Sequence, residues 1–157
     1  MLTETIFKTY TKIRTEIHKL LNHKLYRNKV ILFGVPYLVH RENIQIGDNA
    51  RINPNVTLYG HGGINLGENV TLSHGVSIFS TGYQTKNWRN NKVEKMHENQ
   101  PVSISDNVWL GANAIILKNV FIEEGCIIAA GSVVTHDLLE KNAIYGGNPA
   151  EFIKKLD

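Results

Sequence analysis

Aliphatic residues recur every six positions along most of this 157-residue chain. They form two short series offset by a slip of two residues, and a third series after a gap. The recurring positions are Ile46, Ile52, Leu58, Leu66, Leu72, Ile78, Ile104, Leu110, Ile116, Ile122, Ile128 and Val134. A smaller residue follows most of them by four places, as Val56 follows Ile52. This hexapeptide period predicts an all-β solenoid in which each unit supplies one strand and one corner, with the aliphatic side chain inside.

A six-residue spacing fits neither the stripe of an amphipathic helix nor the simple alternation of an ordinary strand. Three units complete a triangular coil, so the period predicts about four coils, stacked at ~4.8 Å, over residues 44–137. The rhythm breaks over residues 79–101, which predicts a long loop that protrudes from the prism. The whole chain, residues 1–157, is therefore expected to form a single domain.

The two ends of the chain lack the repeat and are expected to cap the coils. Ile6, Tyr10, Ile13, Ile17 and Leu20 follow a 4, 3, 4, 3 spacing, which predicts an amphipathic helix over residues 2–25. We expect this helix to pack against the prism; the competing interpretation is a helix on a membrane surface. Residues 138–157 are expected to form a C-terminal cap that ends in a short helix after a Gly-Gly-Asn-Pro turn.

Composition excludes several classes of protein. The formal net charge is +3, too mild to require nucleic acid as a partner. One cysteine, Cys126, rules out an internal disulfide framework, and its interior position indicates packing. The absence of a long apolar run argues against a signal peptide or membrane span, so a cytoplasmic location is expected. No spacing of His, Cys, Asp and Glu predicts a metal site.

Three motifs carry a resemblance to a known family. They are Asp106-Asn-Val-Trp-Leu-Gly-Ala-Asn-Ala114, Ala129-Ala-Gly-Ser-Val-Val-Thr135 and Gly147-Asn-Pro-Ala150. From about Ile44 to Lys155 the sequence resembles the hexapeptide-repeat acetyltransferases, most of all the galactoside, maltose and polysaccharide O-acetyltransferase branch. The resemblance implies a left-handed parallel β-helix that assembles as a homotrimer, with acetyl-CoA as acyl donor and a sugar or glycan precursor as acceptor.

The resemblance also assigns residues to the CoA site. It implies that backbone groups at Ala112 and Ala130 bind the pantetheine arm and that the Trp109 indole lies near the acyl end. Small side chains suit this role because they let a ligand approach the backbone, although both alanines would also suit as simple corner fillers. The residues that remain for the rest of CoA are Thr135, Lys154 and Lys155.

The family's catalytic histidine is missing. The position that matches it is Tyr83, and a phenol with an ordinary pKa near 10 is a poorer base at neutral pH than an imidazole with one near 6.5. His97, in the protruding loop, is our first choice for the base, with Glu98 or Glu94 to orient it. His74, at a corner of the preceding coil, is the second choice. Either could instead be an ordinary solvent-exposed histidine.

The resemblance places His61 and Asn53 in the acceptor pocket, and Tyr83 is assigned to substrate binding. A corner Asn could equally satisfy only the turn backbone. The predicted function is O-acetyl transfer to a sugar by direct attack, with a histidine as general base. The alternatives are an N-acetyltransferase acting on an amino sugar and an inactive hexapeptide-repeat binding protein.

Overall fold

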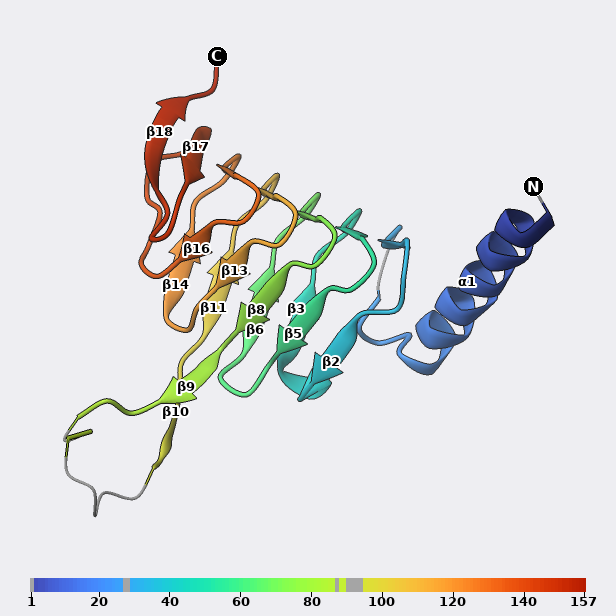
Figure 1. Cartoon of the computed structure of the whole chain (residues 1–157), viewed down its shortest axis with the longest axis horizontal. Coiled ribbons are helices and arrows are strands. Elements are labelled where there is room, and N and C mark those ends of the chain that lie inside the picture. Colours follow the sequence, from blue (N-terminus) through green and yellow to red (C-terminus); the bar gives the residue numbers. More distant parts are fainter. Residues whose placement is uncertain (1, 27–28, 87, 90–94) are drawn as a thin grey trace.

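The computed structural model describes residues 2–26, 29–86, 88–89 and 95–157. Short strands wind into a prism with three sheets as its faces, and one helix lies at its N-terminal end (Figure 1). Sheet A contains β1 (Ile31–Leu32), β4 (Arg51–Ile52), β7 (Thr71–Leu72), β12 (Trp109–Leu110), β15 (Ile127–Ile128), β17 (Ala143–Gly146) and β18 (Glu151–Lys155). Sheet B contains β2 (Tyr37–Val39), β5 (Thr57–Tyr59), β8 (Ser77–Phe79), β13 (Ile115–Ile116) and β16 (Val133–Val134). Sheet C contains β3 (Ile44–Ile46), β6 (Ile64–Leu66), β11 (Val102–Ile104) and β14 (Val120–Ile122).

The solenoid is longer than the sequence pattern indicated. Sheet B contributes one strand per turn, so its five strands mark about five turns where about four were predicted. The additional turn is the first one. Leu32 pairs in register with Ile52, and Leu38 pairs with Leu58, so both continue the six-residue period toward the N-terminus. A second two-residue slip, between Leu38 and Ile46, obscured this signal in the sequence.

The aliphatic repeat fills the interior as predicted. Ile52, Leu72, Leu110 and Ile128 form one register column across sheet A, and all four are fully buried. Burying such a side chain contributes about 1.5–3 kcal/mol relative to leaving it in water. Each turn therefore repeats the same packing, and the stack of turns forms one continuous core.

Asparagine recurs at the corners because these positions need a left-handed backbone. Asn49, Asn69 and Asn107 have φ of 56–60° at the corner between sheets C and A. Asn55 and Asn113 have φ of 62° and 58° at the corner between sheets A and B. Asparagine tolerates this region better than most residues, since its short polar side chain can bond locally.

Where residues 79–101 interrupt the repeat, the described parts of the loop leave the prism as two paired strands. The strands of this hairpin are β9 (Thr81–Tyr83) and β10 (His97–Asn99), which pair antiparallel (Figure 1). Glu94, one of the two residues expected to orient the base, lies outside the described residues.

The C-terminal segment is a strand, and the expectation of a short closing helix was wrong. β17 extends sheet A in parallel with β15, and β18 folds back to pair antiparallel with β17. A seven-residue segment is too short to hold a helix by itself. The open edge of β17 offers unpaired backbone groups, and β18 occupies them, which closes this end of the sheet.

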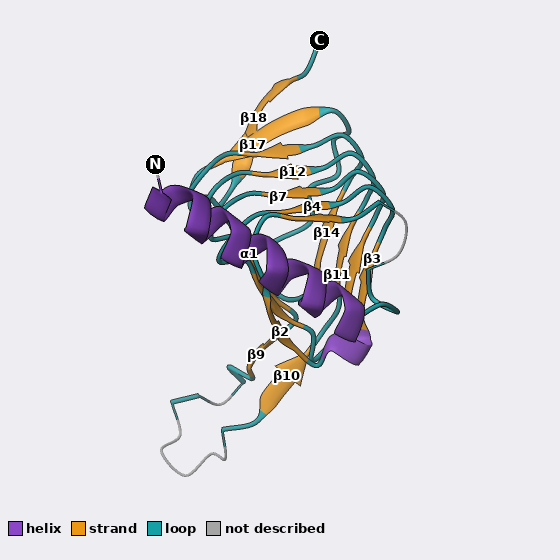
Figure 2. Ribbon diagram, turned by 90° about the vertical axis from the view of Figure 1, so that its right-hand side faces the viewer, coloured by secondary structure: helices purple, strands orange, loops and turns teal. Residues whose placement is uncertain are grey.

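The N-terminal helix α1 (Leu2–Leu21) ends four residues earlier than predicted and crosses the N-terminal end of the coil stack (Figure 2). It turns its polar face toward the prism: Thr15 is buried, and Thr11 and His18 are partly buried. The helix therefore packs against the prism as expected, but through its polar face, and the apolar stripe is exposed. A turn after α1 anchors the helix. His18 Nε2 lies 2.9 Å from the Tyr26 hydroxyl, and Arg41 donates to Asn22 Oδ1 at 2.7 Å.

Acidification is expected to release this anchor. The pKa of His18 is lowered from its ordinary 6.5, first by burial and second by the nearby Arg41 guanidinium. The folded state therefore binds fewer protons than the unfolded state, so the anchor is complete above about pH 6.5 and is lost as the pH falls below that value. Hydrogen exchange of the α1 amides, corrected for intrinsic rates, should accelerate at low pH in the wild type and less in His18→Gln. Equal acceleration in both proteins would contradict this role; His23→Gln is the control.

Candidate functional site

The corner between sheets A and B carries unused hydrogen-bond donors. His74, Ala112 and Ala130 occupy equivalent positions in successive turns, since Asn113 N–H donates to His74 O (2.9 Å) and Gly131 N–H donates to Ala112 O (2.8 Å). Within the described part of the chain, nothing accepts a hydrogen bond from the N–H of His74, Ala112 or Ala130. The three amides form a row with a spacing of about 4.8 Å.

A comparison with another corner shows that the side chains at this one leave the row open. Glu68 has the equivalent place between sheets C and A, and its N–H donates to Asp106 Oδ1 at 2.7 Å. The equivalent residues of the next turn are Ala112 for His74 and Ala130 for Ala112, and a methyl side chain can make no such bond. The amides of His74 and Ala112 therefore stay available to a ligand, and the amide of Ala130 has no acceptor among the described residues either. Gly111 keeps the turns close here, because a Cβ at this position would lie 2.7 Å from Ala130 N.

Trp109 stands beside this row in a defined orientation. The indole is 48% exposed on the outer face of sheet A, and its Nε1–H donates to Ser73 Oγ at 2.9 Å. Ser73 was not among the residues selected from the sequence; its place immediately before His74, at the end of β7, was the available signal. The register column of Trp109 continues through Ile127 and Ile144 to Lys154. Lys154 therefore lies on the same outer face, three strands from Trp109, a backbone separation of about 14 Å.

Two of the other residues assigned to CoA are placed less favourably. Lys155 forms an ion pair with Glu140, and that hydrogen bond raises the pKa of Lys155 above its ordinary value. Thr135 follows β16 and lies at the corner between sheets B and C, with its hydroxyl 3.2 Å from His136 Nδ1. The structure therefore groups Trp109, Ala112, Ala130 and Lys154 along sheet A and separates Thr135 from them.

His97 lies directly beside Tyr83, the residue predicted from the resemblance to match the family's histidine. β9 and β10 pair so that His97 is opposite Tyr83, and the two ring centroids are 4.5 Å apart. Both side chains are exposed, and Trp88 lies 6.0 Å from Tyr83 on the same hairpin. The His97 imidazole on β10 is thus one strand away from Tyr83 on β9, where a histidine was expected.

Glu98 does not orient His97, contrary to expectation. Alternate residues of a strand point to opposite faces, and Glu98 accepts a hydrogen bond from Lys118 Nζ at 2.7 Å. Lys118 also donates to Gln100 Oε1 at 3.3 Å. These bonds attach β10 to the prism.

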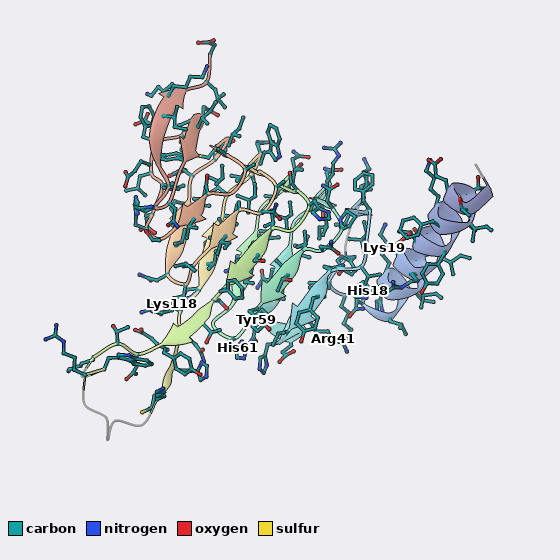
Figure 3. All side chains as sticks on the ribbon, viewed as in Figure 1. His18, Lys19, Arg41, Tyr59, His61 and Lys118 are labelled. Carbon is teal, nitrogen blue, oxygen red and sulfur yellow. The ribbon has the colours of Figure 1, made fainter. Side chains whose placement is uncertain are left out.

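The same edge holds an aromatic and histidine cluster. His61 stacks on Tyr59 with ring centroids 6.0 Å apart and meets His40 edge-on at 4.4 Å. Figure 3 shows Tyr59, His61 and Lys118 near the end of the prism face from which the hairpin leaves. His61 Nδ1 is buried, and no described residue bonds to it. His40, which also bonds to Glu42 at 2.9 Å, was missed from the sequence because it precedes the repeats then recognised.

The candidate residues fall on two separate edges. Asn53 precedes β5 and His74 precedes β8, so both lie at the corner between sheets A and B. His61 follows β5 and Tyr83 follows β8, so these two lie at the opposite edge of sheet B. From corner to corner, for example from His74 to Ser80, about six residues of extended chain or roughly 20 Å separate the two edges. Asn53 Nδ2 donates to Leu72 O at 2.9 Å, so its side chain bonds to the backbone of the neighbouring turn, the alternative role considered above. One chain therefore does not bring all the candidates together.

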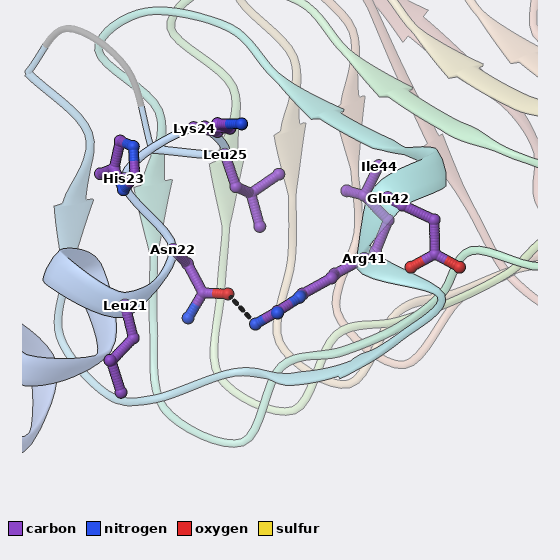
Figure 4. Close-up of a pocket in the computed structure, with 8 residues that line it drawn as sticks. All are labelled: Leu21, Asn22, His23, Lys24, Leu25, Arg41, Glu42 and Ile44. Carbon is purple, nitrogen blue, oxygen red and sulfur yellow. Dashed lines mark hydrogen bonds between the residues drawn. The ribbon is translucent and has the colours of Figure 1, made fainter.

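A separate hollow lies at the N-terminal end of the prism. A cavity of about 520 Å³ lies between the end of α1 and the 3₁₀ turn η1 (Arg41–Asn43), and Figure 4 shows Leu21, Lys24, Arg41 and Glu42 around it. It contains none of the residues selected from the sequence. Among the described residues, no three His, Cys, Asp or Glu side chains converge as metal ligands. Cys126 is buried, and burial raises the pKa of its thiol.

Comparison with known proteins agrees with this architecture. Residues 101–136 match the bacterial transferase hexapeptide (six repeats), and residues 43–80 match the hexapeptide repeat of succinyl-transferase. Galactoside O-acetyltransferase of Escherichia coli (strain K12) is 30% identical over 123 residues, which cover 77% of this chain and 58% of that protein. The chain belongs to the hexapeptide-repeat acetyltransferase family.

Solved structures of hexapeptide-repeat acetyltransferases share its fold. A maltose O-acetyltransferase from Clostridium difficile 630 superposes with a TM-score of 0.80 at 26% identity, covering 96% of this chain and 86% of that chain. An acetyltransferase from Vibrio cholerae O1 biovar eltor, solved in complex with acetyl coenzyme A, gives a TM-score of 0.75 at 25% identity, covering 91% and 78%. The chain spans less than two thirds of the galactoside O-acetyltransferase's length.

Removal of the Lys118 ammonium should loosen the hairpin. In Lys118→Met, hydrogen exchange at residues 97–99 is expected to accelerate about two- to fivefold, because a partly exposed ion pair contributes up to about 1 kcal/mol. Exchange measured by mass spectrometry tests this, with Lys141→Met as a matched control that loses ion pairs to Glu123 and Glu124 instead. Unchanged exchange in Lys118→Met would show that the ion pair does not hold β10.

Proposed function

We propose that this protein transfers an acetyl group from acetyl-CoA to a hydroxyl of a sugar or of a polysaccharide or glycan precursor. The observation that carries the proposal is the row of open backbone amides at Ala112 and Ala130 beside the anchored indole of Trp109. Amides of this kind can bind the pantetheine arm and stabilise the oxyanion of an acyl-transfer intermediate. The named O-acetyltransferases among its relatives support the hydroxyl as acceptor.

Sheet A offers a path for the rest of CoA. The outer face between Trp109 and Lys154 is lined by Ile127 and Ile144, both partly exposed. A chain of CoA's length can lie along this column with its phosphates near the Lys154 ammonium. The ion pair with Glu140 makes Lys155 the weaker candidate for phosphate binding.

The proposed chemistry is direct transfer. His97 removes the proton from the acceptor hydroxyl, and the oxygen attacks the thioester carbonyl to form a tetrahedral oxyanion. Collapse of that intermediate breaks the carbon–sulfur bond and releases CoA thiolate, which takes up a proton from the imidazolium. No acyl-enzyme is formed, and a ping-pong pattern in steady-state kinetics would contradict this step.

The two edges described above are proposed to meet between copies of the chain. A base at the hairpin and amides at the opposite corner of sheet B lie roughly 20 Å apart in one chain, too far to act on one acetyl group. A homotrimer in which each copy places its hairpin against the next copy's sheet A corner resolves this separation and gives three equivalent sites. His74 remains the alternative base, because it lies on the amide edge itself.

Loss of the imidazole should abolish most turnover. His97→Ala is expected to lower the rate of CoA release in the presence of acceptor by about 100- to 10,000-fold, the usual contribution of a general base. The measurement is thiol release from acetyl-CoA across a panel of sugars and glycan fragments, with hydroxyl and amino acceptors compared. His74→Ala is assayed alongside, and His23→Ala serves as an exposed-histidine control. If only His74→Ala is inactive, His97 is not the base.

Mixing two inactive variants should restore activity if the site is shared. His97→Ala and Trp109→Ala each damage a different edge, so a refolded equal mixture is expected to regain about a quarter of the wild-type sites. The readout is the same thiol release, with each variant refolded alone as the control. No gain above the separate variants would show that both edges act within one chain or that Trp109 is dispensable.

A further inference from the structure

The helix α1 leaves a large apolar stripe uncovered. The side chains of this stripe lie along one face, and each is more than half exposed: Ile6, Tyr10, Ile13, Ile17 and Leu20. At 3.6 residues per turn this face points almost directly away from Thr11 and Thr15, which contact the prism. Large contiguous apolar patches are rare on the surfaces of soluble proteins and mark interaction sites.

Charge is concentrated in the same segment. Residues 1–29 contain seven Lys and Arg against two Glu, a net charge of +5. The other 128 residues contain ten against twelve, a net charge of −2. The mild charge of the whole chain therefore conceals a basic N-terminal segment on an acidic prism. Arg14 lies at the edge of the stripe, with its guanidinium 5.5 Å from the centre of the Tyr10 ring.

The position of the helix leaves the stripe accessible. α1 lies outside the coil stack at its N-terminal end, and the described prism does not cover its outer side (Figures 1 and 2). In the part of the chain that the structure describes, no helix is long and apolar enough to cross a bilayer. A basic helix with one exposed apolar face has the features of a segment that lies in the plane of a membrane interface.

We propose that α1 binds the surface of an anionic lipid bilayer and inserts its apolar stripe into the interface, with Ile13 and Ile17 near the centre of the stripe. The charge favours this occupant over a second copy of the chain, because pairing two copies of the helix would bring together two segments of net charge +5. The 4, 3, 4, 3 spacing spans only about two heptads, fewer than the three or four that identify a coiled coil. Basic residues near the surface add attraction to anionic headgroups, and the apolar side chains enter the interface.

The full chain should float with vesicles of phosphatidylcholine containing about 30% phosphatidylglycerol, and bind vesicles of phosphatidylcholine alone about tenfold or more weakly. Binding should fall as salt is raised toward about 1 M, since salt screens the headgroup attraction. Wild-type protein that stays in the aqueous fraction with anionic vesicles at low salt would overturn the proposal. Vesicle binding needs no acceptor or CoA, so its outcome is independent of the proposed enzyme activity.

The double variant Ile13→Glu/Ile17→Glu tests the stripe and should lower the vesicle partition coefficient by about a hundredfold, because each buried aliphatic side chain contributes roughly tenfold. Leu139→Glu is the matched control, since Leu139 is 67% exposed and lies at the other end of the prism. Circular dichroism checks the fold of each variant. Equal binding by the double variant and the control would refute the role of the stripe.

A charge variant keeps the test open if the double variant misfolds. Lys12→Glu/Arg14→Glu leaves the stripe intact and should reduce binding to anionic vesicles about tenfold or more, with little change for neutral ones. Light scattering on all proteins detects the competing occupant. If the wild type does not bind vesicles and the Ile13→Glu/Ile17→Glu protein forms smaller oligomers than the wild type, the stripe is an interface between copies and the proposal fails.

Discussion

The in-register stacking of successive turns is the constraint on which the rest of this structure depends. Each turn bonds to the next through parallel strands, so residues at equivalent positions of the repeat lie in columns about 4.8 Å apart. The interior column enforces this register, because a slip by one residue would turn every aliphatic side chain of a strand to solvent. Both the core and the candidate site follow from this one rule.

Stacking turns a local property of a corner into an extended surface. A single small residue at a corner leaves one amide unpaired, whereas Ala112 and Ala130 in consecutive turns leave adjacent donors in line. The same rule places Trp109 and Lys154 on one outer face although 45 positions separate them in the chain. An elongated ligand suits such a surface, since each turn offers it another contact at a fixed interval.

The sequence predicted the structure well at positions that must be buried, and less well where a segment could pack against more than one part of the chain. The period of Leu58 and Ile116 predicted the coils, because an interior position admits little but an aliphatic side chain. The pattern of α1 predicted a helix and its apolar face, but periodicity does not say what covers that face, and the prism contacts the polar side around Thr15. For the last residues, the deciding factor was the free edge of β17, which exists only once the sheet has formed. The pairing of His97 with Tyr83 likewise depends on a register that the intervening loop sequence does not reveal.

The antiparallel hairpin supplies a physical reason why a tyrosine at position 83 is compatible with the proposed chemistry. Residues directly opposite each other on paired strands have Cβ atoms about 4.5–5.5 Å apart, so an imidazole at His97 is displaced from the family position by only one strand spacing. The hairpin is joined to the prism through Glu98 and Lys118, so this displacement occurs on an attached element. The Tyr83 ring contacts the His97 ring, with their centroids 4.5 Å apart. In this proposal the base is on β10 instead of β9, and it still lies at the same edge of the prism.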